Sequence, residues 1–367
     1  MTIFIVESKF KVIQIELISN GITLQCSLWH SRGCSPPNCL IYLHSAGMNQ
    51  FEALNIVPYI VNEHISLFAF DFPGCGKSSS ELLPFDGNGP SYVMSCARYL
   101  HRVEKIEKFA LWGRSMGAAI ALHTVSLYSD SFSSIVSDSA FSDLDSLIND
   151  QLKSKGCPKL LIKSIKKYFK KKVNKFYHEK SSPKIAKEKS EPSNFKWRKK
   201  YRVCNTRDVP KETSIKVAES VVNDEVDEFY CNSDDYVIRN NKVEVDFCFP
   251  LSCISKATVP LLIGHGNQDR YVPPSHGQRI FKSYGSMNKQ LYTFDAVHFK
   301  SRPYYWYDNA VRFIYKHINV RPRFYEFVYG GSNLHIGDVD TILRNLCAVR
   351  TFEVTDVSDD DEDDADN

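Results

Sequence analysis

The sequence FALWGRSMGAAIAL, at residues 109–122, decides the fold of this chain. It begins with an apolar run of strand length, continues through a Gly-x-Ser-x-Gly turn, and ends with small and apolar residues at helical spacing. The pattern predicts a strand, a sharp turn and a helix, with Ser115 at the corner. Gly113 and Gly117 suit this turn because it leaves no room for a Cβ, and the corner exposes the Ser115 hydroxyl at the edge of a sheet.

Strand-like and helix-like segments alternate on both sides of this turn. Buried-strand patterns occupy residues 39–43, 65–70, 135–136, 261–263 and 290–294, and helical patterns occupy residues 51–62, 91–105, 275–284 and 304–317. Such alternation predicts a parallel sheet with right-handed crossovers. Two earlier strand-like runs, residues 11–18 and 22–30, flank Asn20-Gly21, which is a strong hairpin signal. The fold is therefore expected to open with an antiparallel pair.

The composition excludes several classes of protein. The 367 residues are 43% hydrophobic and 24% charged, as in an ordinary globular protein with a large core. No run of 18 apolar residues is present, which argues against a membrane span, and residues 1–17 do not resemble a signal peptide. The eleven cysteines form no close metal-type pairs, so we expect reduced thiols and no metal. A cytoplasmic location is predicted, with attachment to the periphery of a membrane as the alternative.

A lysine-rich stretch interrupts the alternating pattern. Between Lys153 and Lys200, 18 Lys or Arg residues stand against 3 Glu. Residues 158–177 have apolar side chains at spacings of three and four, which predicts a basic amphipathic helix. We expect this helix to be a lid with its apolar face toward the active site and its lysines toward solvent. The alternatives are a packed surface helix and a weak contact of the Lys153 to Lys200 stretch with an anionic membrane surface. Nucleic acid is not expected, because few aromatic residues lie among the lysines.

These patterns divide the chain into four parts. Residues 1–150 and 256–320 are expected to form the two halves of the core, and residues 151–255 a lysine-rich insertion. Residues 321–367 form a C-terminal extension, in which residues 323–329 could be an edge strand and residues 339–346 a short helix. Eight of the eleven residues from 356 to 366 are acidic, so this tail is too charged to fold alone. We expect it to contact the basic stretch transiently, and the alternative is a solvating tail that contacts nothing in particular.

A serine hydroxyl needs a neighbouring base, and that base needs an acid to orient it. Asp269 follows the strand at residues 261–263, and His298 follows the strand at residues 290–294. Because the carboxyl ends of parallel strands share one edge of the sheet, both side chains can meet Ser115 there. Asp138, which ends the strand after the nucleophile, is the alternative acid. His44 and His265 also end buried strands, where an imidazole often connects loops, and they are weaker candidates.

An oxyanion that forms beside Ser115 would need two backbone N–H donors. Met116, directly after the serine, is expected to supply the first at the start of the following helix. Ala46, in the loop after the strand at residues 39–43, is expected to supply the second.

Several motifs together resemble those of the α/β-hydrolase superfamily. They are HSAG at residues 44–47, DFPGCGKS at residues 71–78, GRSMG at residues 113–117, GHG at residues 264–266 before Asp269, VPP at residues 272–274, and His298. The resemblance covers residues 20–178 and 255–318. It is closest to the serine aminopeptidase-like or acylaminoacyl-peptidase-like branch, which includes the α/β-hydrolase-domain depalmitoylases.

This resemblance implies an α/β-hydrolase fold: a mostly parallel, doubly wound sheet with an N-terminal antiparallel hairpin and a basic, lid-like insertion. It also implies a Ser115, Asp269 and His298 triad that works without a metal or other cofactor. The chain departs from the family at Ser45, where the family usually has Gly. Residues 178–258 and those after 318 have no recognised counterpart, and the N-terminal cysteine cluster of the depalmitoylases is absent.

The function expected from these residues is the hydrolysis of an acyl ester or thioester through an acyl-enzyme intermediate. The substrate would be a small molecule or an acylated protein. One alternative is a peptidase-like amide hydrolase, and another is a binding or scaffold protein that keeps the fold without catalysis. The sequence indicates no oligomeric state.

Overall fold

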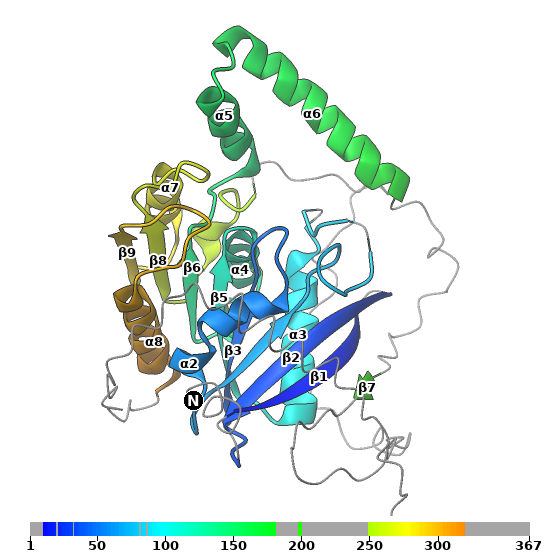
Figure 1. Ribbon diagram of the computed structural model, residues 1–367, viewed down its shortest axis with the longest axis vertical. Coiled ribbons are helices and arrows are strands. Elements are labelled where there is room, and N and C mark those ends of the chain that lie inside the picture. The colour runs from blue at the N-terminus through cyan, green and yellow to red at the C-terminus, as the bar shows by residue number, and fades with distance from the viewer. Residues whose placement is uncertain are drawn as a thin grey trace, which may run out of the picture. The chain divides into compact units, whose positions relative to one another are not determined.

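The computed structural model in Figure 1 describes residues 10–180, 197–199 and 249–319, apart from residues 20, 32, 81 and 86. The chain divides into two units, Met1–Pro322 and Arg323–Asn367, and every described residue belongs to the first. The edge strand expected at residues 323–329, the helix at 339–346 and the acidic tail at 356–366 lie outside the described residues, as does much of the insertion. No helix in the described part is long and apolar enough to cross a membrane.

The described strands form a single sheet in the order β7-β1-β2-β4-β3-β5-β6-β8-β9. Their bounds are β1 Phe10–Ser19, β2 Ile22–Ser31, β3 Asn38–Leu43, β4 Ser66–Phe70, β5 Lys108–Arg114, β6 Ser134–Asp138, β7 Trp197–Lys199, β8 Leu261–Gly266 and β9 Lys289–Phe294.

The six neighbouring strands β4, β3, β5, β6, β8 and β9 run parallel to one another. The pairs β7–β1, β1–β2 and β2–β4 are antiparallel. Ser19 pairs with Ile22, so a two-residue turn closes the β1–β2 hairpin. The antiparallel opening and the mostly parallel sheet expected from the sequence are therefore confirmed.

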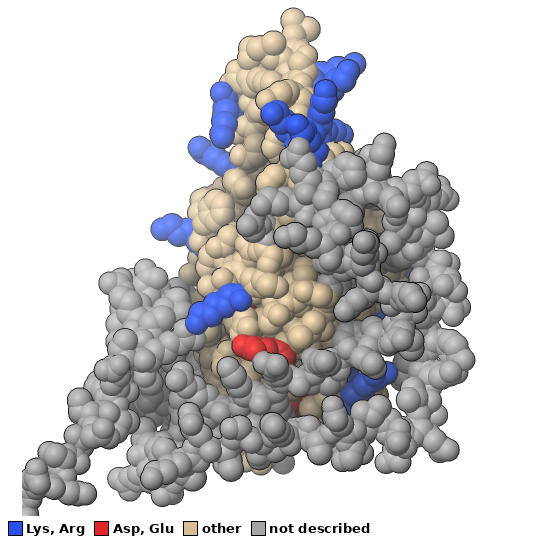
Figure 2. Space-filling model, turned by 90° about the vertical axis from the view of Figure 1, so that its right-hand side faces the viewer, with Lys and Arg blue, Asp and Glu red and all other residues tan. Residues whose placement is uncertain are grey.

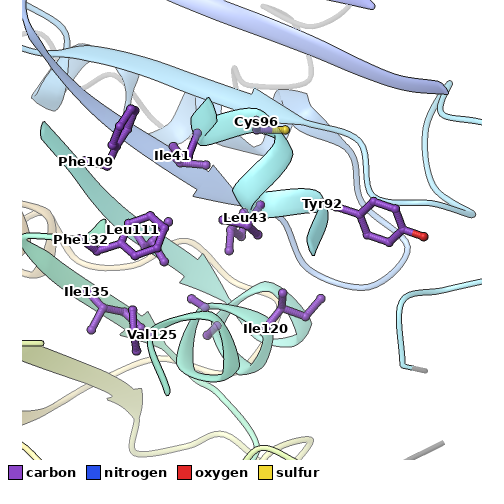
Figure 3. Close-up of a cluster of buried hydrophobic side chains, with 14 of the residues drawn as sticks. Ile41, Leu43, Tyr92, Cys96, Phe109, Leu111, Ile120, Val125, Phe132 and Ile135 are labelled. Atoms are coloured by element: carbon purple, nitrogen blue, oxygen red, sulfur yellow. The ribbon is translucent and has the colours of Figure 1, made fainter. Parts of the chain in front are cut away.

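Both faces of the central strands are buried. In β3, Ile41 and Leu43 join the hydrophobic cluster on one face, while Leu40 and Tyr42 join the cluster on the other. This alternation follows from the two-residue period of a strand, and it explains why the central strands are continuous apolar runs. Figure 3 shows the first cluster, where Ile120 and Val125 of α4 lie beside side chains of β3 and β5.

Helices cover the two faces of the sheet (Figure 1). The covering helices are α2 Val57–Ile60, α3 Gly89–Glu104, α4 Met116–Leu127, α7 Ser275–Ser283 and α8 Tyr304–Ile318. Two further helices, α5 Leu144–Ser154 and α6 Lys159–Lys180, stand off the sheet in Figure 1. Residues of α3, α4 and α7 belong to the first cluster, and residues of α2 and α8 belong to the second.

The single helix expected at residues 51–62 is wrong. The structure has a 3-10 helix, Gln50–Asn55, followed by the short α2. Pro58 explains the break, because it has no N–H for an intrahelical hydrogen bond and its ring clashes with the preceding turn. Proline is tolerated where it stands, in the first turn of α2.

Helix α5 spans residue 150, where the sequence predicts the boundary between the first part of the core and the insertion. The chain contacts the core again from residue 249. Phe249 packs near Phe141, with 6.4 Å between the ring centroids. Leu251 N–H donates to the Ser142 carbonyl at 2.8 Å, and Pro250 forms a β-bridge with Asp143. The chain therefore leaves the core directly after β6 and returns to the same place, at the edge of the sheet that carries Ser115.

Candidate active site

Ser115 lies at the corner between β5 and α4, as the sequence predicts. Its φ of 51° is in the left-handed region, which a non-glycine residue adopts at a cost of about 1–3 kcal/mol. A Cβ at Gly113 would lie 2.3 Å from the Gly117 carbonyl oxygen, and a Cβ at Gly117 would lie 2.0 Å from the Leu43 carbonyl oxygen. Both glycines are therefore required for the close approach of α4 to β5 and β3.

The structure brings Ser115, His298 and Asp269 together from three separate loops. His298 Nε2 lies 3.0 Å from Ser115 Oγ, and His298 Nδ1 lies 2.6 Å from Asp269 Oδ2. All three side chains are buried. The other carboxylate oxygen of Asp269 accepts hydrogen bonds from the N–H groups of Tyr271 at 3.0 Å and Val272 at 2.7 Å. These bonds hold the carboxylate in place beside the imidazole.

The hydrogen-bond partners determine where the imidazole proton sits. A carboxylate only accepts, so His298 Nδ1 carries the hydrogen that points at Asp269. His298 Nε2 is then the acceptor, and its lone pair faces the Ser115 hydroxyl. This is the arrangement in which a neutral histidine can take the serine proton.

Both expected oxyanion donors lie beside the serine. Ala46, Ser115 and Met116 line the same cavity. Met116 is the first residue of α4, where backbone N–H groups lack intrahelical partners. In the part of the chain that the structure describes, no other hydrogen bond uses the N–H of Ala46 or Met116. Within the described ranges both N–H groups therefore lack an acceptor, and their role as oxyanion donors belongs to the mechanism proposed below.

Ser45, the departure from the family pattern, is turned away from this cavity. Its N–H donates to Glu52 Oε2 at 2.7 Å, and its hydroxyl donates to Glu52 Oε1. Glu52 is itself buried. Ser45 thus fastens the loop that carries Ala46 to the first helical turn after β3, and its side chain is absent from the lining of the cavity.

Arg114 connects this loop to the histidine loop. One guanidinium nitrogen of Arg114 donates to the carbonyls of His298 and Lys300, each at 2.9 Å. The other terminal nitrogen lies 3.8 Å from Glu52 Oε1. Sequence reasoning missed both Arg114 and Glu52. The place of Arg114 inside the Gly-x-Ser-x-Gly turn was the one available signal, because that position must lie beside the nucleophile.

Asp138, the alternative acid, does not reach His298. Both of its carboxylate oxygens accept from Arg302 Nε, at 2.9 and 3.0 Å, and the Ser139 hydroxyl donates to Oδ1 at 3.0 Å. Burial alone would raise the pKa of Asp138, but the charges of Arg302 and Arg114 together with these hydrogen bonds hold that pKa below its usual value. Asp138 therefore stays ionised and anchors Arg302, which the sequence analysis also missed.

The other two histidine candidates support loops. His44 Nδ1 donates to the Ser45 carbonyl at 2.8 Å, and His44 Nε2 accepts from the Phe72 N–H at 2.9 Å. His265 Nε2 donates to the Val272 carbonyl at 2.7 Å, directly behind Asp269. Burial is the main reason why the pKa of each imidazole is lowered, so both rings are neutral at pH 7.

A mostly apolar cavity of about 380 Å³ opens at Ser115. Its walls come from the core and from helices α5 and α6, with Phe141, Leu144, Leu147, Ile148, Ile165 and Phe169 among the lining residues. The volume lies within the usual range of small-molecule pockets. Within the described ranges, no group of three or more His, Cys, Asp or Glu side chains is placed to hold a metal ion.

The lid expectation for α6 is correct for part of its apolar face. Ile165 and Phe169 line the cavity, and Ile162 and Tyr177 are buried. Leu160, Leu161, Tyr168 and Phe176 are exposed and are absent from the lining of the cavity. Two lysines also depart from the expectation, because Lys166 and Lys170 pair with Asp145 of α5.

Comparison with known proteins agrees with this architecture. Residues 39–299 match the family described as the alpha/beta hydrolase fold. The chain is similar to the esterase Pf2001 of Pyrococcus furiosus, with a TM-score of 0.52 and 16% identity over 84% of this chain and 93% of that one. It is also similar to Est1E from Butyrivibrio proteoclasticus, bound to ferulic acid, with a TM-score of 0.50 and 14% identity over 83% of this chain and 99% of that one.

A third similar structure is acetyl xylan esterase 1 from a Thermoanaerobacterium species, with a TM-score of 0.50 and 14% identity over 83% of this chain and 88% of that one. At such identities, these likenesses concern the fold. The family match spans more than half of the chain and includes the serine corner and the loops that hold Asp269 and His298. The chain therefore belongs to the alpha/beta hydrolase fold family.

Proposed function

We propose that this protein is a serine hydrolase that cleaves acyl esters or thioesters. The hydrogen-bonded series from Ser115 through His298 to Asp269, at the wall of an apolar cavity, carries the proposal. Its two distances, 3.0 and 2.6 Å, are those over which a proton is shared or transferred between heavy atoms. A scaffold protein would have no need to hold these three side chains in register from loops that lie far apart in the sequence.

The reaction proceeds in two displacements. Ser115 Oγ attacks the acyl carbon while its proton moves to His298 Nε2, and the carbonyl oxygen becomes an oxyanion facing the N–H groups of Ala46 and Met116. Collapse of this intermediate releases the alcohol or thiol, which takes the proton from Nε2. Water then attacks the acyl-enzyme and gives its proton to His298 Nε2. The bond between the acyl carbon and Ser115 Oγ breaks, Oγ takes the proton back from Nε2, and the carboxylic acid leaves. Asp269 keeps Nδ1 protonated throughout.

The apolar lining of the cavity favours substrates whose acyl group is apolar. Its lining offers little to a polar side chain, which favours an acyl ester or thioester over an aminoacyl amide. The esterases among the similar folds support the same class. The motifs at residues 44–47 and 71–78 also lead us to propose membership of the serine aminopeptidase-like branch, which leaves amide hydrolysis as the second candidate. Both small molecules and acylated proteins are candidate substrates.

Covalent labelling with a fluorophosphonate probe tests the mechanism. We expect labelling of the wild-type chain and none of Ser115→Ala, because only an activated serine reacts. Failure to label the folded wild-type chain would leave the non-catalytic binding protein as the better description. A panel of p-nitrophenyl esters of graded length, an acyl thioester and an aminoacyl anilide then identifies the substrate class.

Substitution of the two aspartates tests the acid. Asp269→Asn should lower kcat by about 10⁴-fold, because the amide would favour the wrong imidazole tautomer. Asp138→Asn should leave the chemistry intact in every molecule that folds correctly. Dividing the measured rate by the concentration of sites that the fluorophosphonate labels corrects for any unfolded fraction. Full activity in Asp269→Asn together with loss in Asp138→Asn would overturn the assignment.

A further inference from the structure

We infer that helix α6 docks on an anionic membrane surface and holds the mouth of the Ser115 cavity against it. The docking itself does not depend on catalysis. Delivery of an acyl chain from the bilayer to Ser115 is the second half of the inference, and it rests on the proposed function.

A row of lysines gives α6 a positive edge that forms no ion pair within the described residues, although its first three members border the same hollow as Asp145. Lys159, Lys163, Lys167 and Lys171 follow one another at intervals of four residues, so they lie along one side of the helix. All four are exposed, and no acidic side chain among the described residues pairs with any of them. This row therefore differs from the lysines that Asp145 neutralises.

Large apolar side chains on α6 are exposed next to this row. Leu160 is 91% exposed, Leu161 53% and Tyr168 64%. Figure 2 shows lysine and arginine side chains on both sides of uncharged surface in the upper part of the visible face. A helix that combines exposed apolar residues with flanking lysines is typical of segments that lie in the plane of a membrane interface.

The apolar strip continues into the cavity. Ile165 lies four residues after Leu161 and three before Tyr168, so the three share one side of the helix. Ile165 also lines the cavity at Ser115. An acyl chain that leaves a bilayer beneath α6 can therefore follow an apolar path to the nucleophile. This path points to acyl groups of membrane-anchored molecules as the substrate source.

Charge and apolarity together favour a lipid surface over another polyanion. The lysine row attracts any anionic surface, but a bilayer, unlike a hydrophilic polyanion such as a nucleic acid, also buries Leu160, Leu161 and Tyr168. Each lysine close to an anionic membrane is worth on the order of five-fold in binding, so loss of three should weaken binding on the order of 100-fold. Loss of the exposed apolar residues should weaken vesicle binding further. High salt should not restore that loss, because salt screens the lysine charges and does not replace the apolar contact.

Sedimentation of the full-length chain with vesicles tests the docking. We expect binding to vesicles that contain phosphatidylserine and little binding to pure phosphatidylcholine. Lys159→Gln, Lys163→Gln and Lys167→Gln combined should reduce binding about 100-fold. The matched control combines Lys256→Gln, Lys282→Gln and Lys316→Gln, which removes the same charge from exposed positions outside α6 and should change binding less than five-fold.

The double variant Leu160→Gln and Tyr168→Gln tests the apolar strip, because neither residue lines the cavity. It should weaken vesicle binding while the turnover of a water-soluble ester stays within two-fold of wild type. No binding to anionic vesicles, an equal loss in the control triple variant, or tighter binding to an oligonucleotide than to vesicles would overturn the inference.

Vesicle binding by Ser115→Ala separates the inference from the proposed function. Binding that persists in this variant while wild type hydrolyses no ester would refute the proposed function alone. Hydrolysis of water-soluble esters without vesicle binding would refute the docking alone. Equal turnover of a vesicle-embedded acyl ester by wild type and the α6 lysine triple variant would refute the delivery path.

Discussion

The ion pair between Asp138 and Arg302 should contribute far more to stability than an exposed pair of the same chemistry. Arg302 Nη2 and Nε both lie 2.9 Å from Asp138 Oδ1, and the two side chains are 0% and 3% exposed. Arg302→Met removes the cation and leaves a carboxylate in the interior. Breaking a buried pair in this way costs about 3–5 kcal/mol. That loss is a large part of the roughly 5–15 kcal/mol by which a typical protein is stable.

The pH dependence of this loss provides a second, independent check. The pKa of Asp138 is lowered in the folded wild type, so the pair's contribution is fully present above the unfolded pKa of about 3.9 and is lost as pH falls through the folded pKa. Without Arg302, burial is opposed by fewer interactions, the charge of Arg114 and the Ser139 hydrogen bond, so the pKa of Asp138 should rise and the carboxyl can take up a proton at a higher pH than in the wild type. The difference between variant and wild type should therefore be larger at pH 7.5 than at pH 4.5.

Urea unfolding at both pH values measures the effect. The control is Arg312→Met, which breaks a pair with Asp308 that also spans 2.8 Å but is 57% and 40% exposed, and it should cost less than about 1 kcal/mol. Asp138→Asn combined with Arg302→Met should recover much of the stability, because no charge is then left buried. Equal costs for the two arginine variants, or a loss that does not change with pH, would refute this reasoning.

Two further predictions concern the geometry of the site. Gly113→Ala should abolish ester hydrolysis or folding, because its Cβ would lie 2.3 Å from a backbone carbonyl oxygen. In the control Gly156→Ala the Cβ meets no atom within 4 Å, so this variant should lose about 1 kcal/mol of unfolding free energy and keep its activity. Circular dichroism and ester turnover distinguish the two. Glu52→Gln should lower kcat about ten-fold with little change in KM, because it weakens the anchor of the loop that holds an oxyanion donor. The exposed control Glu107→Gln should change neither constant; a Glu52→Gln enzyme with wild-type kcat would show that the anchor is dispensable.

Local sequence determined the serine corner and the positions around it. The turn at residues 113–117 needs two glycines because α4 approaches the neighbouring strands too closely for a Cβ, and this constraint is visible in the sequence without any partner. The central strands were equally predictable, because burial on both faces produces continuous apolar runs. The three-residue strand β7, within the lysine-rich insertion, was not predicted. Once parallel strands are assigned, their carboxyl ends must share one edge, which is why Asp269 and His298 could be placed beside Ser115 from order alone.

Only the tertiary structure decided how the charges around this corner are paired. Asp138 and Arg302 are 164 residues apart in the sequence, and the histidine loop and Arg114 are 184 residues apart. No local pattern links such residues, because the partner of a buried charge depends on which loops the sheet brings together. The sequence alone therefore left Asp138 as an alternative acid and gave no role to Glu52. In the folded chain Asp138 pairs with Arg302, and Glu52 accepts hydrogen bonds from the loop beside the serine. Both pairings follow from burial, because a buried carboxylate is stable only where donors or a cation surround it.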